Sequence, residues 1–366
     1  MLVMAWALAL MGTGEPAPSI QTQADAYMAQ KGVGSLSIAI TRSGKDYCYA
    51  VGKAAGVEPA GPATIYEIGS ITKTFTGLLL AQTVTAGPWR LDDDVSDRLG
   101  GDYANLAFDG HPVRLVHLTS MTSGLPDSLP ARPAEEAGTP RDRAFARARQ
   151  LESYSEEAFL ADLGAVALTS EPGSSPGHSN VAAELLGLLL EREHGSGFGD
   201  LLKQQVEVPA GIAGPASTDV TAESLNLQGE TMPYLTAASA RASGGLRYNA
   251  ADMLRYAHLQ LQEDDPAVRL SHEPQWKTLD QKLGIAFGWI WHAESPAGRR
   301  LRTSGGSFGF ASFIDLYPDS ETAIVLMTNG ADDPTQGELQ TLSETFVETI
   351  STTAENTWAA GLGTCA

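Results

Sequence analysis

Apolar positions near the start of the chain follow the pattern of strands. Residues 35–40 (SLSIAI) and 47–51 (YCYAV) are largely apolar, and the six residues between them contain a glycine. Two such runs around a Gly-containing turn predict a β-hairpin. The pattern also predicts a helix over residues 22–31, immediately before the hairpin.

Helical spacing dominates the middle of the chain. Apolar positions recur at helical intervals from residue 74 to about 84, and Gly87-Pro88 ends that run. Residues 181–193 predict a strongly apolar helix, and residues 250–261 predict another. Residues 131–150 are rich in Pro, Ala and charged side chains, so we expect a polar insertion or long loop there.

Strand-like runs return towards the C-terminus. Residues 284–292, 310–316 and 322–328 predict strands, and residues 343–352 predict a closing helix. Strands near both ends with helices between them indicate an α/β (α+β) fold, with one mixed sheet built from both termini and a helical domain inserted.

The same pattern suggests where the domains divide. We expect a sheet domain of residues 20–66 plus 275–366 and a mainly helical domain of residues 67–274. The candidate functional residues named below would lie at the interface of the two domains.

Length and charge restrict the class of protein. The 366 residues are 43% hydrophobic, which suits a globular enzyme with one large domain or two intertwined lobes. The formal net charge is −20. Because binding to nucleic-acid phosphates needs clustered Lys and Arg, this charge argues against a nucleic-acid partner.

The first residues, MLVMAWALALM, form a short apolar run. The run is too short to span a bilayer and fits the apolar region of a secretory signal, although a basic start is missing. We expect residues 1–19 to be a truncated signal segment, with no stable membrane span, in a periplasmic or secreted protein. The alternative is a frayed apolar terminus or a core helix.

Two cysteines occur, Cys48 and Cys365. They are too few for a disulfide framework or for a zinc site, which needs four ligands at close spacing. A single bridge between the C-terminal tail and the early strand would require an oxidising compartment. Because buried free cysteines are common, we expect the two to remain unpaired.

Candidate chemistry begins at Ser70 and Lys73, within the run YEIGSITKTFTGLLLAQ. Residues three apart on a helix share a face, with Cβ atoms about 5–6 Å apart, so the Lys73 ammonium can reach the Ser70 hydroxyl. A serine at a helix N-terminus beside a base is the arrangement of an activated nucleophile. Ser-x-x-Lys alone is a weak motif, and a surface serine beside a solvated lysine is the alternative.

Further segments follow in the order of a known family. Residues 91–95 (LDDDV), 117–126 (HLTSMTSGLP) and 243–253 (SGGLRYNAADM) resemble segments of the serine β-lactamases and penicillin-binding proteins, especially class C β-lactamases and their peptidase and esterase relatives. The resemblance implies the β-lactamase/transpeptidase-like fold, an antiparallel sheet flanked by helices. It also implies that Ser70 is the nucleophile and Lys73 its base.

The family's second catalytic element, Tyr-x-Asn, is altered in this chain. His178 stands at the Tyr position, and Asn180 matches. A neutral imidazole is a competent base near pH 7, so the resemblance places a proton shuttle at His178. Asn180 would orient Lys73 and bind a substrate amide; its alternative role is to cap the helix that follows.

The third element, Lys-Thr-Gly or His-Thr-Gly, aligns with Thr303, Ser304 and Gly305. Ser304 and Gly305 suit a strand that pairs with substrate backbone. Thr303 is uncharged, and Arg302 points to the opposite face of the strand. A substrate carboxylate would therefore lose a charged partner worth about 1.5–3 kcal/mol of binding.

These features predict an exported serine hydrolase, most like class C β-lactamases, that acylates itself on an amide or ester carbonyl of a small-molecule or peptide substrate. Backbone N–H groups of Ser70 and Gly306 would hold the oxyanion. The alternatives are a D-amino-acid peptidase or carboxypeptidase, an esterase, or a non-catalytic homologue that binds cell-wall ligands. We expect a monomer with no metal or organic cofactor. The remaining histidines without metal-site spacing are expected at the surface or behind the site: His111, His194, His258, His272 and His292.

Overall fold

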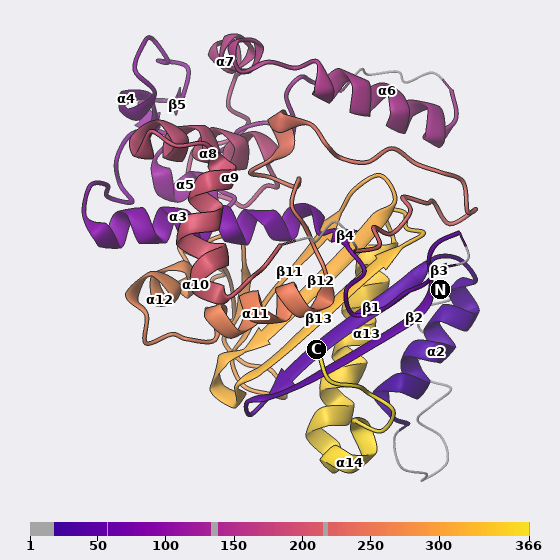
Figure 1. Ribbon diagram of the computed structural model, residues 1–366. Coiled ribbons are helices and arrows are strands. Elements are labelled where there is room, and N and C mark those ends of the chain that lie inside the picture. The colour runs from indigo at the N-terminus through magenta and orange to yellow at the C-terminus, as the bar shows by residue number, and fades with distance from the viewer. Residues whose placement is uncertain (1–17, 57, 133–137, 215–218, 366) are drawn as a thin grey trace.

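The computed structural model describes residues 18–56, 58–132, 138–214 and 219–365. Within these ranges the centre is a nine-stranded sheet in the order β3-β2-β1-β13-β12-β11-β10-β9-β8 (Figure 1). Its strands are β1 (Ser35–Arg42), β2 (Lys45–Ala55), β3 (Glu58–Pro59), β8 (Trp276–Lys277), β9 (Leu283–Ile285), β10 (Ile290–His292), β11 (Arg300–Gly306), β12 (Phe310–Tyr317) and β13 (Thr322–Asn329).

The two ends of the chain meet at the centre of this sheet. β1 lies beside β13 with Leu36 opposite Thr328, so the predicted hairpin joins strands from the far end of the chain. Every pairing in the sheet is antiparallel, not mixed as the pattern alone suggested. The antiparallel sheet implied by the resemblance is confirmed.

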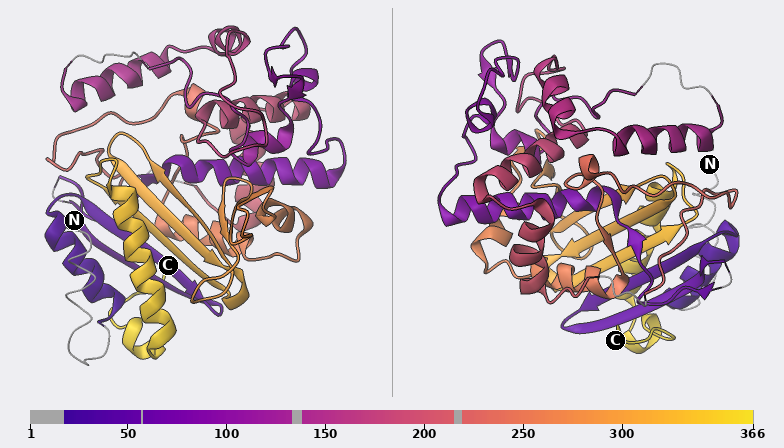
Figure 2. Two further views of the ribbon diagram at one scale, coloured as in Figure 1. Left: turned by 180° about the vertical axis from the view of Figure 1, so that it is seen from behind. Right: turned by 45° about the horizontal axis from the view of Figure 1, so that its top comes forward.

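One face of the sheet is covered by α2 (Ile20–Lys31), α13 (Thr335–Thr352) and α14 (Glu355–Trp358), as Figure 2 shows in its left view. Alternate residues of β12 point to each side of the sheet, as the two-residue period of a strand requires. Phe313 packs into the cluster beneath α13, while Ile314 belongs to the cluster on the opposite face.

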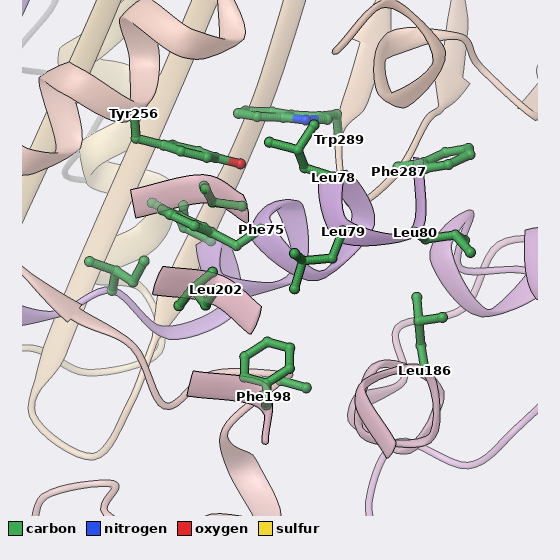
Figure 3. Packing of buried hydrophobic residues seen from close by; sticks show 14 of the residues in the cluster. Phe75, Leu78, Leu79, Leu80, Leu186, Phe198, Leu202, Tyr256, Phe287 and Trp289 are labelled. Atoms are coloured by element: carbon green, nitrogen blue, oxygen red, sulfur yellow. The ribbon is translucent and has the colours of Figure 1, made fainter. Parts of the chain in front are cut away.

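The opposite face packs against the helical part of the chain: α3 (Thr72–Ala86), α8 (Asn180–His194), α11 (Ala250–Gln260) and α12 (Pro266–His272). Phe75 of α3 stacks on Tyr256 of α11 with ring centroids 3.6 Å apart, and Trp289 lies in the same cluster (Figure 3). A Cβ at Gly77 would lie 2.8 Å from the Phe287 Cβ, so α3 approaches this layer as closely as glycine permits. This packing holds the first turn of α3 at the edge of the sheet.

The remaining helices are α4 (Val95–Leu99), α5 (Leu115–Thr119), α6 (Pro140–Glu152), α7 (Glu156–Gly164), α9 (Phe198–Leu202) and α10 (Val208–Ala210). Two short strand pairs accompany them: β4 (Tyr66–Glu67) with β7 (Arg247–Tyr248), and β5 (Ala107–Phe108) with β6 (His111–Pro112). None of the helices in the described ranges is both long enough and apolar enough to cross a membrane. The predicted signal segment lies almost wholly outside the described residues.

The prediction of a long loop over residues 131–150 is wrong for the second half of this range, because α6 begins at Pro140. Thr139 caps that helix by accepting a hydrogen bond from the Asp142 backbone N–H at 3.2 Å, and Pro140 stands at its first position. Ala, Arg, Gln and Leu, which follow, are good helix formers. In this segment the helix-start signals and the helix propensity of the residues therefore outweigh the polar composition that suggested a loop.

Two other elements differ in extent. The single strand predicted over residues 284–292 is two strands, β9 and β10, because Gly288 adopts a positive φ of 76° and the chain turns there. The closing helix predicted from residue 343 begins at Thr335.

The expectation of free cysteines is wrong. Cys48 and Cys365 form a disulfide, with Cα atoms 5.0 Å apart. The C-terminal tail lies along β2, where the Cys48 N–H donates to the Gly363 carbonyl at 2.8 Å and the Gly363 N–H donates to the Cys48 carbonyl at 2.9 Å. This backbone pairing positions the tail, and the sequence pattern does not reveal it.

Candidate active site

Ser70 lies in a tight turn directly ahead of α3. Gly69–Ile71 form one 3₁₀ turn, and Gly69 has a φ of 50°. A Cβ at Gly69 would lie 2.4 Å from the Gly306 nitrogen of β11. Because only glycine permits this conformation and approach, the turn places Ser70 against the sheet.

Lys73 is buried with 7% of its surface exposed, and its Nζ lies among three oxygens. It donates to Ser70 Oγ at 2.9 Å, to Asn180 Oδ1 at 2.7 Å and to the Ser243 carbonyl at 2.8 Å. Burial lowers the pKa of Lys73 to about 8, against the opposing effect of the negative charge of Glu184. An amine with a pKa this close to neutral can both give and accept a proton near physiological pH.

Asn180 is the first residue of α8 and turns its side chain to Lys73. The helix is capped by Ser179, whose Oγ accepts from the Ala182 N–H at 3.0 Å. The alternative role of Asn180 as helix cap is therefore wrong, because the preceding serine occupies the capping position.

Glu184 supports the site from behind, and the motifs do not identify it. It lies one turn after Asn180 on α8, and its Oε1 accepts from the backbone N–H groups of Ser243 at 2.8 Å and Ala242 at 3.1 Å. Burial raises the pKa of Glu184 to about 7. This carboxyl group holds the backbone of Ser243, the residue whose carbonyl contacts Lys73. The sequence signal that could have found Glu184 is its i,i+4 spacing from Asn180 on an apolar helix.

His178 lies on the open side of the site, with its Nε2 3.4 Å from Ser70 Oγ. Its Nδ1 lies 2.5 Å from Asp127 Oδ1, and the two side chains are 49% and 50% exposed. The hydrogen bond from His178 lowers the pKa of Asp127, and the positive charges of Lys73 and Arg132 add to this effect. Asp127 is a second residue that the motif reading missed, although it directly follows the segment 117–126.

The C-terminal end of β11 forms the opposite wall. The β10 ladder reaches β11 only as far as the Ile290–Arg302 pair, so residues 303–306 have an open edge on that side in the described sheet. A Cβ at Gly305 would lie 2.8 Å from the Ser70 nitrogen, so Gly305 faces Ser70. Thr303 shares this face by strand alternation and is 6% exposed.

The other face of β11 points away from the site. Arg302 Nη1 lies 3.6 Å from Glu344 Oε1 of α13, and a Cβ at Gly306 would meet Gln336 of the same helix. Ser304 lies between them on this face by alternation. Arg302 therefore cannot replace the cation that Thr303 lacks.

One of the remaining histidines is placed differently from the prediction. His272 is 2% exposed in the core beside Trp289, neither at the surface nor behind Lys73. Its Nδ1 lies 2.6 Å from Glu263 Oε1, and its Nε2 lies 2.8 Å from Gln260 Oε1. These polar partners make burial of the imidazole tolerable, and sequence spacing does not reveal them.

Comparison with known proteins identifies the family. The family model described as Beta-lactamase matches residues 20–344. The chain belongs to the β-lactamase family.

Relatives within the β-lactamase family carry more than one activity in their names. The D-alanyl-D-alanine-carboxypeptidase/endopeptidase AmpH of Escherichia coli (strain K12) is 23% identical over 286 residues, covering 72% of this chain and 71% of that protein. A protein named Beta-lactamase from the same strain is 22% identical over 342 residues, covering 82% and 85%. A solved class C β-lactamase matches with a TM-score of 0.73 at 19% identity over 92% of this chain and 97% of that one, which shows the shared fold.

Proposed function

We propose that this β-lactamase-family protein is a serine hydrolase that forms an acyl-enzyme on Ser70. The observation that carries the proposal is the surroundings of Lys73 Nζ. Asn180 Oδ1 and the Ser243 carbonyl can only accept hydrogen bonds, so a neutral Lys73 amine spends its two N–H groups on them. Its lone pair then points to the third neighbour, Ser70 Oγ, where it can take the hydroxyl proton.

Backbone N–H groups of Ser70 and Gly306 would stabilise the oxyanion. Glycines at positions 69 and 305 support this assignment, because a side chain at either one would collide with backbone of the opposite segment. The two amides are thereby brought to the same edge of the site. Removal of one such donor typically costs about 10²–10³-fold in kcat.

We propose that esters and uncharged amides are better substrates than carboxylate-bearing β-lactams or D-peptides. Thr303 occupies the wall position where a cation would bind a carboxylate, and Arg302 is held on the other face by Glu344. The names of the relatives favour the other two classes, a β-lactam or a D-alanyl-D-alanine peptide.

We further propose that the protein acts outside the cytoplasm as a monomer. The Cys48–Cys365 disulfide supports export, because such bonds persist in oxidising compartments.

Intact-mass spectrometry combined with product release tests the proposal. The protein is mixed separately with p-nitrophenyl butyrate, a chromogenic cephalosporin and a D-alanyl-D-alanine peptide. We expect turnover of the ester that is lost in Ser70→Ala and kept in Ser320→Ala, whose serine lies in the turn between β12 and β13. Turnover of the cephalosporin above the ester would reverse the substrate order. No turnover and no adduct with any probe would favour a ligand-binding homologue.

A further inference from the structure

Asp127 and His178 form a pair aimed at Ser70. A carboxylate can only accept, so the 2.5 Å contact with Asp127 Oδ1 places the imidazole proton on His178 Nδ1. The lone pair of a neutral His178 then lies on Nε2, the atom that is 3.4 Å from Ser70 Oγ. Hydrogen bonds of this kind are often long before substrate binds and shorten in the reacting complex.

Backbone contacts hold the two segments that carry this pair. The Asn180 N–H donates to the Asp127 carbonyl at 2.9 Å, and Ser179 Oγ donates to the Pro126 carbonyl at 2.7 Å. One residue before His178, the Gly177 N–H donates to the Met121 carbonyl at 2.6 Å. His178 and Asp127 are therefore placed by main-chain bonds on both sides, although their side chains are half exposed.

When Lys73 is protonated, it cannot act as the base for Ser70. An ammonium has three N–H donors, and Lys73 Nζ has three oxygen neighbours. In that state Ser70 Oγ accepts from Lys73, and its own proton needs another acceptor. His178 Nε2 is within reach of that proton.

We propose that Asp127 is a positioning residue that makes His178 the proton acceptor for Ser70, so that a Ser–His–Asp relay operates beside the Ser–Lys pair. The proposal rests on the serine-hydrolase function proposed above. It adds that the site has two alternative bases for one nucleophile, and that Asp127 supports only one of them.

The relay balances at each step. Ser70 Oγ bonds to the substrate carbonyl carbon, its proton moves to His178 Nε2, and the carbonyl π pair moves onto oxygen. Collapse of this oxyanion breaks the bond to the leaving group, which takes the proton from Nε2. Water then attacks the acyl-enzyme, gives a proton to Nε2, and Ser70 takes that proton back as the acid is released.

The charged groups around His178 come from the elements packed on it. Asp127 contacts the imidazole directly, Lys73 faces it across Ser70, Arg132 acts on Asp127, and Glu184 lies behind Lys73. Lys73, with a pKa of about 8, is mainly an ammonium at about pH 7 and mainly neutral at about pH 9.5. The relay should therefore matter most at neutral pH.

The test measures kcat/KM for Asp127→Asn and Asp127→Ala at both pH values, with whichever of p-nitrophenyl butyrate and the chromogenic cephalosporin the wild type hydrolyses. We expect a loss of about 10–100-fold at neutral pH, at the lower end of what general acid–base catalysis contributes because Asp127 acts only through His178, and less than about 3-fold at high pH, where neutral Lys73 replaces the relay. Asp127→Glu, which keeps a carboxylate, should recover part of the loss at neutral pH.

Asp46→Asn is the matched control. Asp46 makes a similarly exposed pair with His258, at 2.8 Å with 40% and 38% exposure. The strand register places it level with Leu301, at the end of the sheet opposite Gly306. The activity of Asp46→Asn should equal that of the wild type at both pH values.

Comparing each variant with itself at the two pH values separates a structural role of Asp127 from a role in the relay. An equal loss at both values would mean that Asp127 only maintains the loop, and no loss at neutral pH would mean that Lys73 acts alone; either result overturns the relay. His178→Gln gives a second test, with the same pH pattern expected. If the wild-type protein neither hydrolyses a probe nor forms an adduct on Ser70, the proposed serine-hydrolase function itself fails. The two failures are distinguishable, because failure of the relay alone leaves the wild-type protein active.

Discussion

Gly305→Ala tests whether close packing of β11 positions the turn that carries Ser70. A Cβ at this position would lie 1.9 Å from the Ile68 carbonyl oxygen, 2.7 Å from Ser312 Oγ and 2.8 Å from the Ser70 nitrogen. Two of these three atoms are backbone, so a rotamer change cannot relieve the clash. The turn has to retreat by about 1 Å before the contact with Ile68 becomes tolerable.

The expected cost follows from this displacement. A misplacement of about 1 Å in a reacting geometry typically costs about 10²-fold, and loss of one oxyanion donor costs about 10²–10³-fold. We therefore expect kcat/KM to fall by about 10²–10³-fold in Gly305→Ala. Overpacking should also lower the free energy of unfolding by about 1–3 kcal/mol.

The assay is kcat/KM together with thermal melting, with Gly337→Ala as control. Gly337 lies in α13, and a Cβ there meets nothing within 4 Å. That variant should keep full activity and gain up to about 1 kcal/mol from better helix propensity. A folded Gly305→Ala protein with activity within about 3-fold of wild type would refute the argument that activity requires the close approach of β11 to Ser70.

Further predictions concern charge, disulfide and substrate range. The pKa of Lys73 falls from 10.5 to about 8 on folding, so Lys73 binds more protons in the unfolded chain between these values and its contribution to stability rises with pH across that window; the difference in free energy of unfolding between the wild type and Lys73→Met should therefore shift in favour of the wild type in melts from pH 8 to 10. Cys48→Ser should lower the free energy of unfolding by about 2–5 kcal/mol, measured by urea denaturation, and a reducing agent should abolish the difference from the wild type. Thr303→Lys should raise kcat/KM for carboxylate-bearing β-lactams by about 10-fold relative to p-nitrophenyl butyrate, since a charged hydrogen bond is worth about 1.5–3 kcal/mol; an unchanged ratio would exclude position 303 as the carboxylate site.

Local sequence patterns determined the elements that depend on neighbours along the chain. The hairpin of β1 and β2, the long strands β12 and β13 and the apolar helices α3, α8 and α11 all follow from apolar period and turn residues. The contact of Ser70 with Lys73 belongs to the same class, because residues three apart are brought together by one turn of helix. The family resemblance came from such short segments in their order.

Tertiary structure alone decided which distant segments meet. The Cys48–Cys365 bridge spans 317 positions, and the Asp127–His178 contact spans 51. Lys73 meets Asn180 and Ser243 only because α8 and the 242–246 segment pack on α3. No local period encodes these meetings, since they follow from the packing of whole helices and strands against one sheet. The sequence by itself therefore determined the Ser70–Lys73 contact proposed as nucleophile and base, while the packed fold decided that a carboxylate stands behind the histidine.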